Sequence, residues 1–105
     1  MTQTHNILYV EDNPDNTMLV KRALEARGYK LLHSPTGIDG VAKAESEDVS
    51  LILLDINLPD IDGYEVARRL RASAKRELTS VPIIAITANA LKGDAEKALE
   101  AGCDV

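Results

Sequence analysis

The sequence predicts an α/β fold, a doubly wound parallel sheet. Short apolar segments alternate with helical segments four times along the chain. Three of the apolar segments, at residues 6–10, 51–54 and 81–86, are almost uninterrupted. Runs of this length are typical of parallel strands covered on both faces, and strand–helix alternation favours right-handed crossovers. A chain of 105 residues is long enough for one domain with its own core, which we place at residues 1–105.

The segments between the apolar runs carry helix signals. Pro14 follows Asn13, a good N-cap, and Gly28 stands where a helix end is expected. The apolar positions between them repeat at helical spacing; they are Met18, Leu19, Ala23 and Leu24. Residues 29–33 form a weaker, more polar run, which suits a strand at the sheet edge.

Three further segments have the same helical character. They cover residues 37–46, 64–74 and 90–101, and Gly102 follows the last of them. With the first helix they complete the alternation of strands and helices.

Composition excludes several classes of function. The net charge is −5 and no basic stripe offsets it, which disfavours direct nucleic-acid binding. Cys103 is the single cysteine, so an internal disulfide is ruled out. Neither a basic N-terminal region nor an apolar run long enough for a signal peptide or a membrane span is present. We therefore expect no membrane insertion and a cytoplasmic location.

Polar side chains follow the most apolar strands. Glu11 and Asp12 follow the first, Asp55 the third and Thr87 the fourth. Parallel sheets bind ligands at the carboxyl ends of their strands. Each residue alone has an ordinary explanation: a strand-end Asp is usually an N-cap, an acid pair a solvated loop, and a Thr a hydroxyl bonded to backbone. Their coincidence at one edge favours a site.

Carboxylates that converge there must be protonated, separated by solvent or neutralised by a cation. Two unit charges about 4 Å apart repel by about 4 kcal/mol at an effective dielectric near 20. Among cations, Mg²⁺ suits a site with one or two carboxylates and several waters. A cation held against Asp55 would screen and polarise an incoming phosphate, so that the carboxylate acts as nucleophile.

Three segments, residues 10–16, 54–63 and 82–88, resemble in order and spacing the signature segments of response-regulator receiver domains. The resemblance runs from Asn6 to Asp104, and residues 11–16 look particularly like receivers of hybrid histidine kinases. It implies a flavodoxin-like strand order 2-1-3-4, with four of the usual five strand–helix units.

The resemblance also implies residue roles in a Mg²⁺ site. Asp55 matches the phosphate acceptor and Asp12 the metal-binding acid. Glu11 matches the partner acid, which often acts through water. Asn57 matches the position whose backbone carbonyl binds the metal.

Further roles are implied around the phosphoryl group. Thr87 matches the hydroxyl that moves to bind it, Ala88 the small residue that leaves room for it, and Asn89 a position that tunes dephosphorylation. Pro59 and Gly63 match the turn that shapes the loop after the acceptor; from the residues alone they read as turn formers.

The sequence departs from the family at its C-terminal end. The family's lysine, its switch aromatic, and its fifth strand and helix have no counterpart up to Val105. Lys92 lies in a predicted helix, where a lysine is normally a solvated charge, so we do not expect it to replace the family lysine. A fragment and a short natural variant both explain the difference. We expect the run from Val81 to Ile86 to form an exposed edge. The chain should then self-associate through this edge, with or without an exchange of elements between chains, or fold with a rearranged C-terminal half.

Two other kinds of metal-dependent site are excluded by the residues at a few positions. Haloacid-dehalogenase-like phosphatases need a second Asp two residues after the nucleophile and then Thr or Val, where this chain has Asn57 and Pro59. An EF-hand loop with Gly63 at its sixth position places Leu58 first and Arg69 twelfth, and neither is a ligand.

The sequence thus predicts a phosphorylation-dependent signalling switch rather than a conventional enzyme. Its expected partners are a histidine kinase or histidine phosphotransfer protein, which donates the phosphoryl group, and a downstream protein target. The alternative is a receiver-like interaction module that binds partners without phosphorylation.

Overall fold

One parallel sheet organises the chain. In the computed structural model, which describes residues 5–86 and 94–104, four strands lie in the order β2-β1-β3-β4. The strands are β1 (Asn6–Val10), β2 (Lys30–Ser34), β3 (Leu51–Asp55) and β4 (Ile83–Ile86). The helices are α1 (Pro14–Glu25), α2 (Gly37–Ser46), α3 (Gly63–Arg71), the 3₁₀ helix η1 (Arg76–Thr79) and α4 (Asp94–Ala101). This arrangement confirms the predicted doubly wound sheet and its strand order.

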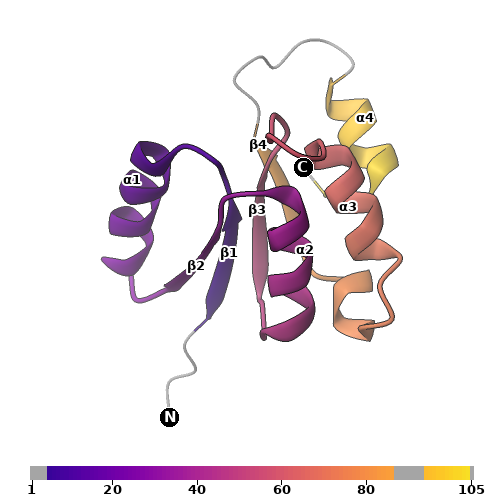
Figure 1. The fold of residues 1–105 in the computed structure, drawn as a ribbon. Helices are drawn as coiled ribbons and strands as arrows, with labels where there is room; N and C mark the ends of the chain where they lie inside the picture. Colours follow the sequence, from indigo (N-terminus) through magenta and orange to yellow (C-terminus); the bar gives the residue numbers. More distant parts are fainter. Residues whose placement is uncertain (1–4, 87–93, 105) are drawn as a thin grey trace.

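The two faces of the sheet are covered differently. Of the described helices, α1 lies on one side of the sheet and α2, α3 and α4 group on the other (Figure 1). The side chains toward the three helices are buried; they are Leu8, Val10, Ile52, Leu54 and Ile83. The smaller cluster on the α1 side is built on Ile7, Tyr9 and Leu31.

The strand register fixes where the polar residues lie. Val10 pairs with both Ser34 and Leu54, and Asp55 pairs with Ile86. Since all four strands are parallel, their carboxyl ends meet at one edge. The residue that follows β1 and the last residue of β3 therefore come together there.

Helix termini follow the predicted signals, with one exception. The Asn13 side chain accepts hydrogen bonds from the backbone N–H groups of Asp15 and Asn16, and Pro14 opens α1. Gly28 and Gly102 have positive φ angles of 90° and 115°, which favour glycine after a helix.

The exception is the helix predicted over residues 64–74, since α3 ends at Arg71. The Ser73 hydroxyl accepts a hydrogen bond from the Lys75 N–H at 3.2 Å, a local bond that competes with further helix. The helix predicted over residues 90–101 begins outside the described residues, which contain Asp94–Ala101 of it.

The β4 edge is only partly uncovered. Both backbone groups of Ile83 are paired by Asp104, whose N–H donates to the Ile83 oxygen and whose carboxylate accepts from the Ile83 N–H, each at 2.8 Å. Arg71 holds that carboxylate in an ion pair at 3.0 Å. Farther along the strand, Ile86 is 37% exposed. Among the described residues, this edge is thus covered at its start by Asp104 and has an exposed side chain at its carboxyl end.

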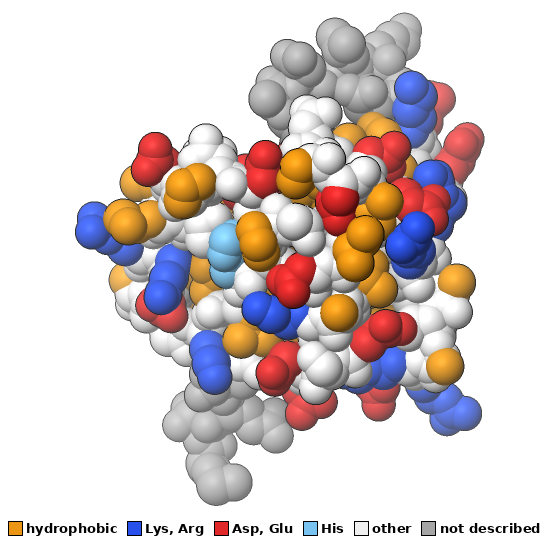
Figure 2. Space-filling model, viewed as in Figure 1, with side chains coloured by type: hydrophobic (Ala, Val, Ile, Leu, Met, Phe, Trp, Pro, Cys, Tyr) orange, Lys and Arg blue, Asp and Glu red, His pale blue; other side chains and the backbone are white. Residues whose placement is uncertain are grey.

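The described surface mixes charges of both signs. On the face seen in Figure 2, acidic and basic side chains are interspersed and no continuous basic stripe crosses it. Among the described residues, none of the helices combines the length and apolar character needed to cross a membrane.

Candidate metal centre

Three carboxylates meet at the carboxyl ends of β1 and β3. Glu11, Asp12 and Asp55 each offer an oxygen, and these oxygens all lie within 4.8 Å of one another. Glu11 is buried, Asp55 is half-buried and Asp12 is exposed. The structure thus brings together the three acids that the sequence singled out, in a gradient from the interior to solvent.

Glu11 is held by hydrogen bonds to both of its carboxylate oxygens. The Tyr9 hydroxyl donates to Oε2 at 3.2 Å, and the backbone N–H of Asn13 donates to Oε1 at 3.1 Å. The Glu11 backbone N–H donates to the Ser34 oxygen at 2.9 Å. A buried carboxylate needs such donors, and these fix its orientation beneath the other two acids.

Tyr9 is a site residue that the sequence reading missed. Burial, together with the charge and hydrogen bond of Glu11, raises the pKa of Tyr9 to about 12. The phenol therefore remains a hydrogen-bond donor at neutral pH. The available signal was spacing, because Tyr9 lies two residues before Glu11 and side chains alternate along a strand. Within the apolar run of residues 6–10, its hydroxyl was not singled out.

Asp55 lies where its negative charge is disfavoured. Burial raises the pKa of Asp55, and the charges of Glu11 and Asp12 raise it further. A hydrogen bond from the Asn57 N–H, 3.1 Å from Oδ1, acts in the opposite direction but does not compensate. A bound cation would remove this repulsion. The donor set consists of hard oxygen ligands, so these residues fit Mg²⁺.

The acids lie in a groove open to solvent. Its volume is about 890 Å³, and it extends from the acids along α1. Leu19 of α1 lines one part and Ile86 of β4 another. Access to Asp55 is therefore from the α1 side of the sheet.

The loop between β3 and α3 approaches the site closely through its glycine. A Cβ atom at Gly63 would lie 2.5 Å from the Asp55 carbonyl oxygen and 2.7 Å from the Ile56 Cα. The Gly63 N–H donates to the Ile56 oxygen at 2.9 Å. The predicted turn role of Gly63 thus has a steric cause. Pro59 is exposed within the same loop.

The structure tells less about the other predicted site residues. Asn57 is exposed, with its N–H bonded to Asp55, and the metal-binding role of its carbonyl stays a prediction. Thr87, Ala88, Asn89 and Lys92 lie outside the described residues.

Comparison with known proteins assigns the chain to a family. The family model of the response regulator receiver domain matches residues 7–105. The chain belongs to this family, and so is a regulatory domain of two-component signalling. The polar-differentiation response regulator DivK of Brucella ovis is 38% identical over 101 residues, which are 96% of this chain and 80% of that protein.

Solved structures agree with this assignment. The receiver domain of a sensor histidine kinase from Pseudomonas aeruginosa has a TM-score of 0.87 and 42% identity, over 97% of this chain and 82% of that one. That structure contains a magnesium ion coordinated in its active-site cleft. A receiver domain protein from Methanospirillum hungatei has the same TM-score and 30% identity, over 97% of this chain and 78% of its own.

Proposed function

We propose that this chain is a phosphorylation-dependent switch in which Asp55 accepts a phosphoryl group in the presence of Mg²⁺. The observation that carries the proposal is the meeting of Glu11, Asp12 and Asp55 at the carboxyl ends of β1 and β3. The magnesium ion in the Pseudomonas aeruginosa receiver supports it. The donor would be a histidine kinase or a histidine phosphotransfer protein, and a downstream protein would respond to the product.

The proposed transfer is a displacement at phosphorus. A carboxylate oxygen of Asp55 attacks the phosphorus of a phosphohistidine, and an acyl phosphate forms as the phosphorus–nitrogen bond breaks. The imidazole nitrogen then takes its proton from solvent. Asp55 suits this role because its raised pKa reflects a carboxylate poorly neutralised by its surroundings, while the groove leaves it accessible.

The metal would be held mainly by the more exposed acids. Asp12, Asp55 and the backbone carbonyl of Asn57 would bind Mg²⁺, with Glu11 acting through water because its oxygens already accept hydrogen bonds. When bound, the ion would neutralise the acids and polarise the phosphoryl oxygens.

The residues beyond β4 complete the proposed site. Thr87 would donate its hydroxyl to the phosphoryl group. Ala88 and Asn89 would border it, the first leaving room and the second affecting hydrolysis. These roles rest on the family resemblance of the segment that follows Ile86.

The proposal extends to location and self-association. A reducing, cytoplasmic setting fits the single cysteine, Cys103, which is free and buried. Residues 1–105 would act as a receiver domain. Self-association would use the carboxyl-terminal half of β4, where Ile86 is exposed.

Phosphorylation by a small donor tests the proposal. The protein is incubated with acetyl phosphate and Mg²⁺, and phosphate is located by mass spectrometry of its peptides. We expect one phosphoryl group on Asp55, lost in Asp55→Asn and retained in Asp62→Asn. Phosphate on Asp60 or Asp62 would contradict the assignment of Asp55 as the acceptor. No phosphate at all, with Mg²⁺ demonstrably bound, would contradict the proposal and favour a non-switching interaction module.

A further inference from the structure

The loop after Asp55 contains the carbonyl proposed to bind metal, and among the described residues few hydrogen bonds tie it to other elements. It consists of residues 56–62, between β3 and α3. At its start the Ile56 N–H donates to the Ile86 oxygen and the Asn57 N–H to Asp55, and at its end the Gly63 N–H donates to Ile56. A metal ligand in such a loop needs a further restraint if its carbonyl is to be held ready for the ion.

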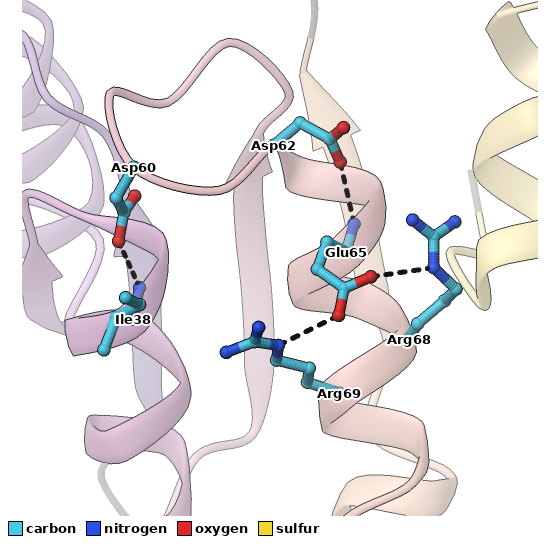
Figure 3. Close-up of polar contacts among 6 residues, drawn as sticks. All are labelled: Ile38, Asp60, Asp62, Glu65, Arg68 and Arg69. Atoms are coloured by element: carbon cyan, nitrogen blue, oxygen red, sulfur yellow. Dashed lines mark hydrogen bonds and ion pairs between the residues drawn. The ribbon is translucent and has the colours of Figure 1, made fainter.

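Asp60 supplies a bond from this loop to another element. Its Oδ1 accepts from the backbone N–H of Gly37 and its Oδ2 from that of Ile38, each at 2.8 Å. Figure 3 shows Asp60 reaching from the loop to the first turn of α2, where its bond to Ile38 is drawn. The neighbouring Asp62 points away from α2 and caps its own helix, α3, through the Glu65 N–H at 2.8 Å.

The first turn of α2 depends on this carboxylate. The first four backbone N–H groups of a helix have no partner within it. In α2 the Thr36 hydroxyl accepts from Asp39 at 3.1 Å, and the Thr36 carbonyl accepts from Gly40 at 2.9 Å. The bond from Gly40 is the first within the helix, and Asp60 accepts from Gly37 and Ile38. The N–H groups of the first three helical residues are thus all satisfied, two of them by a residue from outside the helix.

Close packing accompanies the hydrogen bonds. A Cβ atom at Gly37 would lie 2.6 Å from Cγ1 of Ile61 and 3.2 Å from the Ile61 carbonyl oxygen. The absence of a side chain at Gly37 therefore lets the loop approach the helix. Although slight burial acts against it, hydrogen bonds from Ile38 and Gly37 hold the pKa of Asp60 below its usual value, so the carboxylate is charged at neutral pH.

We infer that Asp60 is a positioning residue for the metal centre. By binding the first two N–H groups of α2, it ties the loop to a rigid helix and thereby holds the Asn57 carbonyl in place. This inference rests on the proposed function, because it concerns the same metal site. Asp60 itself touches neither the metal nor the phosphoryl group.

Magnesium titration of three variants tests this role. Asp60→Ala should weaken Mg²⁺ binding roughly tenfold, the scale of losing an outer partner of a metal ligand. Asp60→Asn, which keeps one acceptor oxygen, should lose less. Thr36→Ala removes the other cap of the same helix and should lower the melting temperature without changing Mg²⁺ affinity.

Charge and order need separate controls. Asp62→Asn removes the same charge from the same loop but keeps an N-cap, so it should leave Mg²⁺ affinity within about twofold of the parent. In metal-free protein, amide hydrogen exchange at Asn57 and Gly63 should be faster in Asp60→Ala than in Thr36→Ala, because only the first variant frees the loop.

The outcomes separate this inference from the proposed function. If the parent binds Mg²⁺ and Asp60→Ala binds equally well, or if Asp62→Asn weakens binding as much, the positioning role is wrong. Failure of the parent itself to bind Mg²⁺ would overturn the metal site. The exchange measurement still decides whether Asp60 orders the loop, and equal exchange in Asp60→Ala and Thr36→Ala would refute it.

Discussion

The side chains on the two faces of the sheet are buried to different degrees. Toward α2, α3 and α4, Ile52, Leu54 and Ile83 are fully buried. Toward α1, Ile7 of β1 is also buried, but Leu53 of β3 and Ile84 of β4 are only half-buried. Of the described helices, α1 alone lies on this side of the sheet, and none of its residues is buried (Figure 1).

The face covered by α2, α3 and α4 contributes most to stability, whereas the α1 face carries the proposed chemistry. A closed face gains free energy from every side chain it removes from water. An open face keeps Asp55 accessible, at the cost of exposed apolar surface such as Leu19 and Ile86 beside the acids. The buried side chains that stabilise the fold and the accessible Asp55 carboxylate thus lie on opposite faces of the same strands.

Two neighbouring leucines of β3 provide the largest expected contrast. Leu54→Ala creates a cavity in the closed face and should lower the free energy of unfolding by about 3–4 kcal/mol, whereas Leu53→Ala on the α1 face should cost about 1–2 kcal/mol. Urea unfolding of both variants measures the difference. Equal losses would show that the two faces are equally well packed.

Self-association should depend on the open face. Ile86→Thr reduces the exposed apolar surface beside β4 and should weaken association roughly tenfold. Leu99→Gln provides a control, because Leu99 is 57% exposed but belongs to α4 on the closed side. Light scattering over a concentration series measures both. A parent that stays monomeric at high concentration, or equal effects of the two changes, would refute this use of the face.

A smaller effect is expected at Asp55 without metal. The pKa of Asp55 is raised by folding, so the charged carboxylate destabilises the folded protein. This destabilisation is absent below the unfolded pKa of about 3.8 and is fully present once the pH has risen through the folded pKa. Asp55→Asn should therefore stabilise the metal-free protein at pH 7 by about 1 kcal/mol, the scale of a screened like-charge contact. The gain should shrink toward pH 4 and upon addition of Mg²⁺. Thermal melts of parent and variant across that range test it; a variant less stable than the parent at pH 7 would contradict the repulsion.

Much of the fold was predictable because its signals are local. Asn13, Pro14 and the apolar runs fixed helix starts and strands, and the alternation fixed the parallel sheet. The three acids were predictable because they directly follow strands or end them, where register brings them together.

Other features depend on contacts between distant segments. The residues around Asp104 in the sequence do not indicate that it pairs with Ile83. Those around Asp60 do not indicate that it binds the first turn of α2. Tyr9 was not singled out as a site residue, because it lies within the apolar run of residues 6–10. These contacts appear only once the chain is folded.

Magnesium titration of the acid cluster is the most direct test of the account. Melting temperature and NMR shifts are followed for the parent, Asp12→Ala and the matched variant Asp15→Ala, since Asp15 lines the same groove outside the cluster. We expect millimolar or tighter binding, with the largest shifts at Asp12, Asp55 and Asn57. Binding should be lost in Asp12→Ala and kept in Asp15→Ala. Equal responses of parent and Asp12→Ala would contradict the metal site, and with it the proposed phosphoryl acceptor.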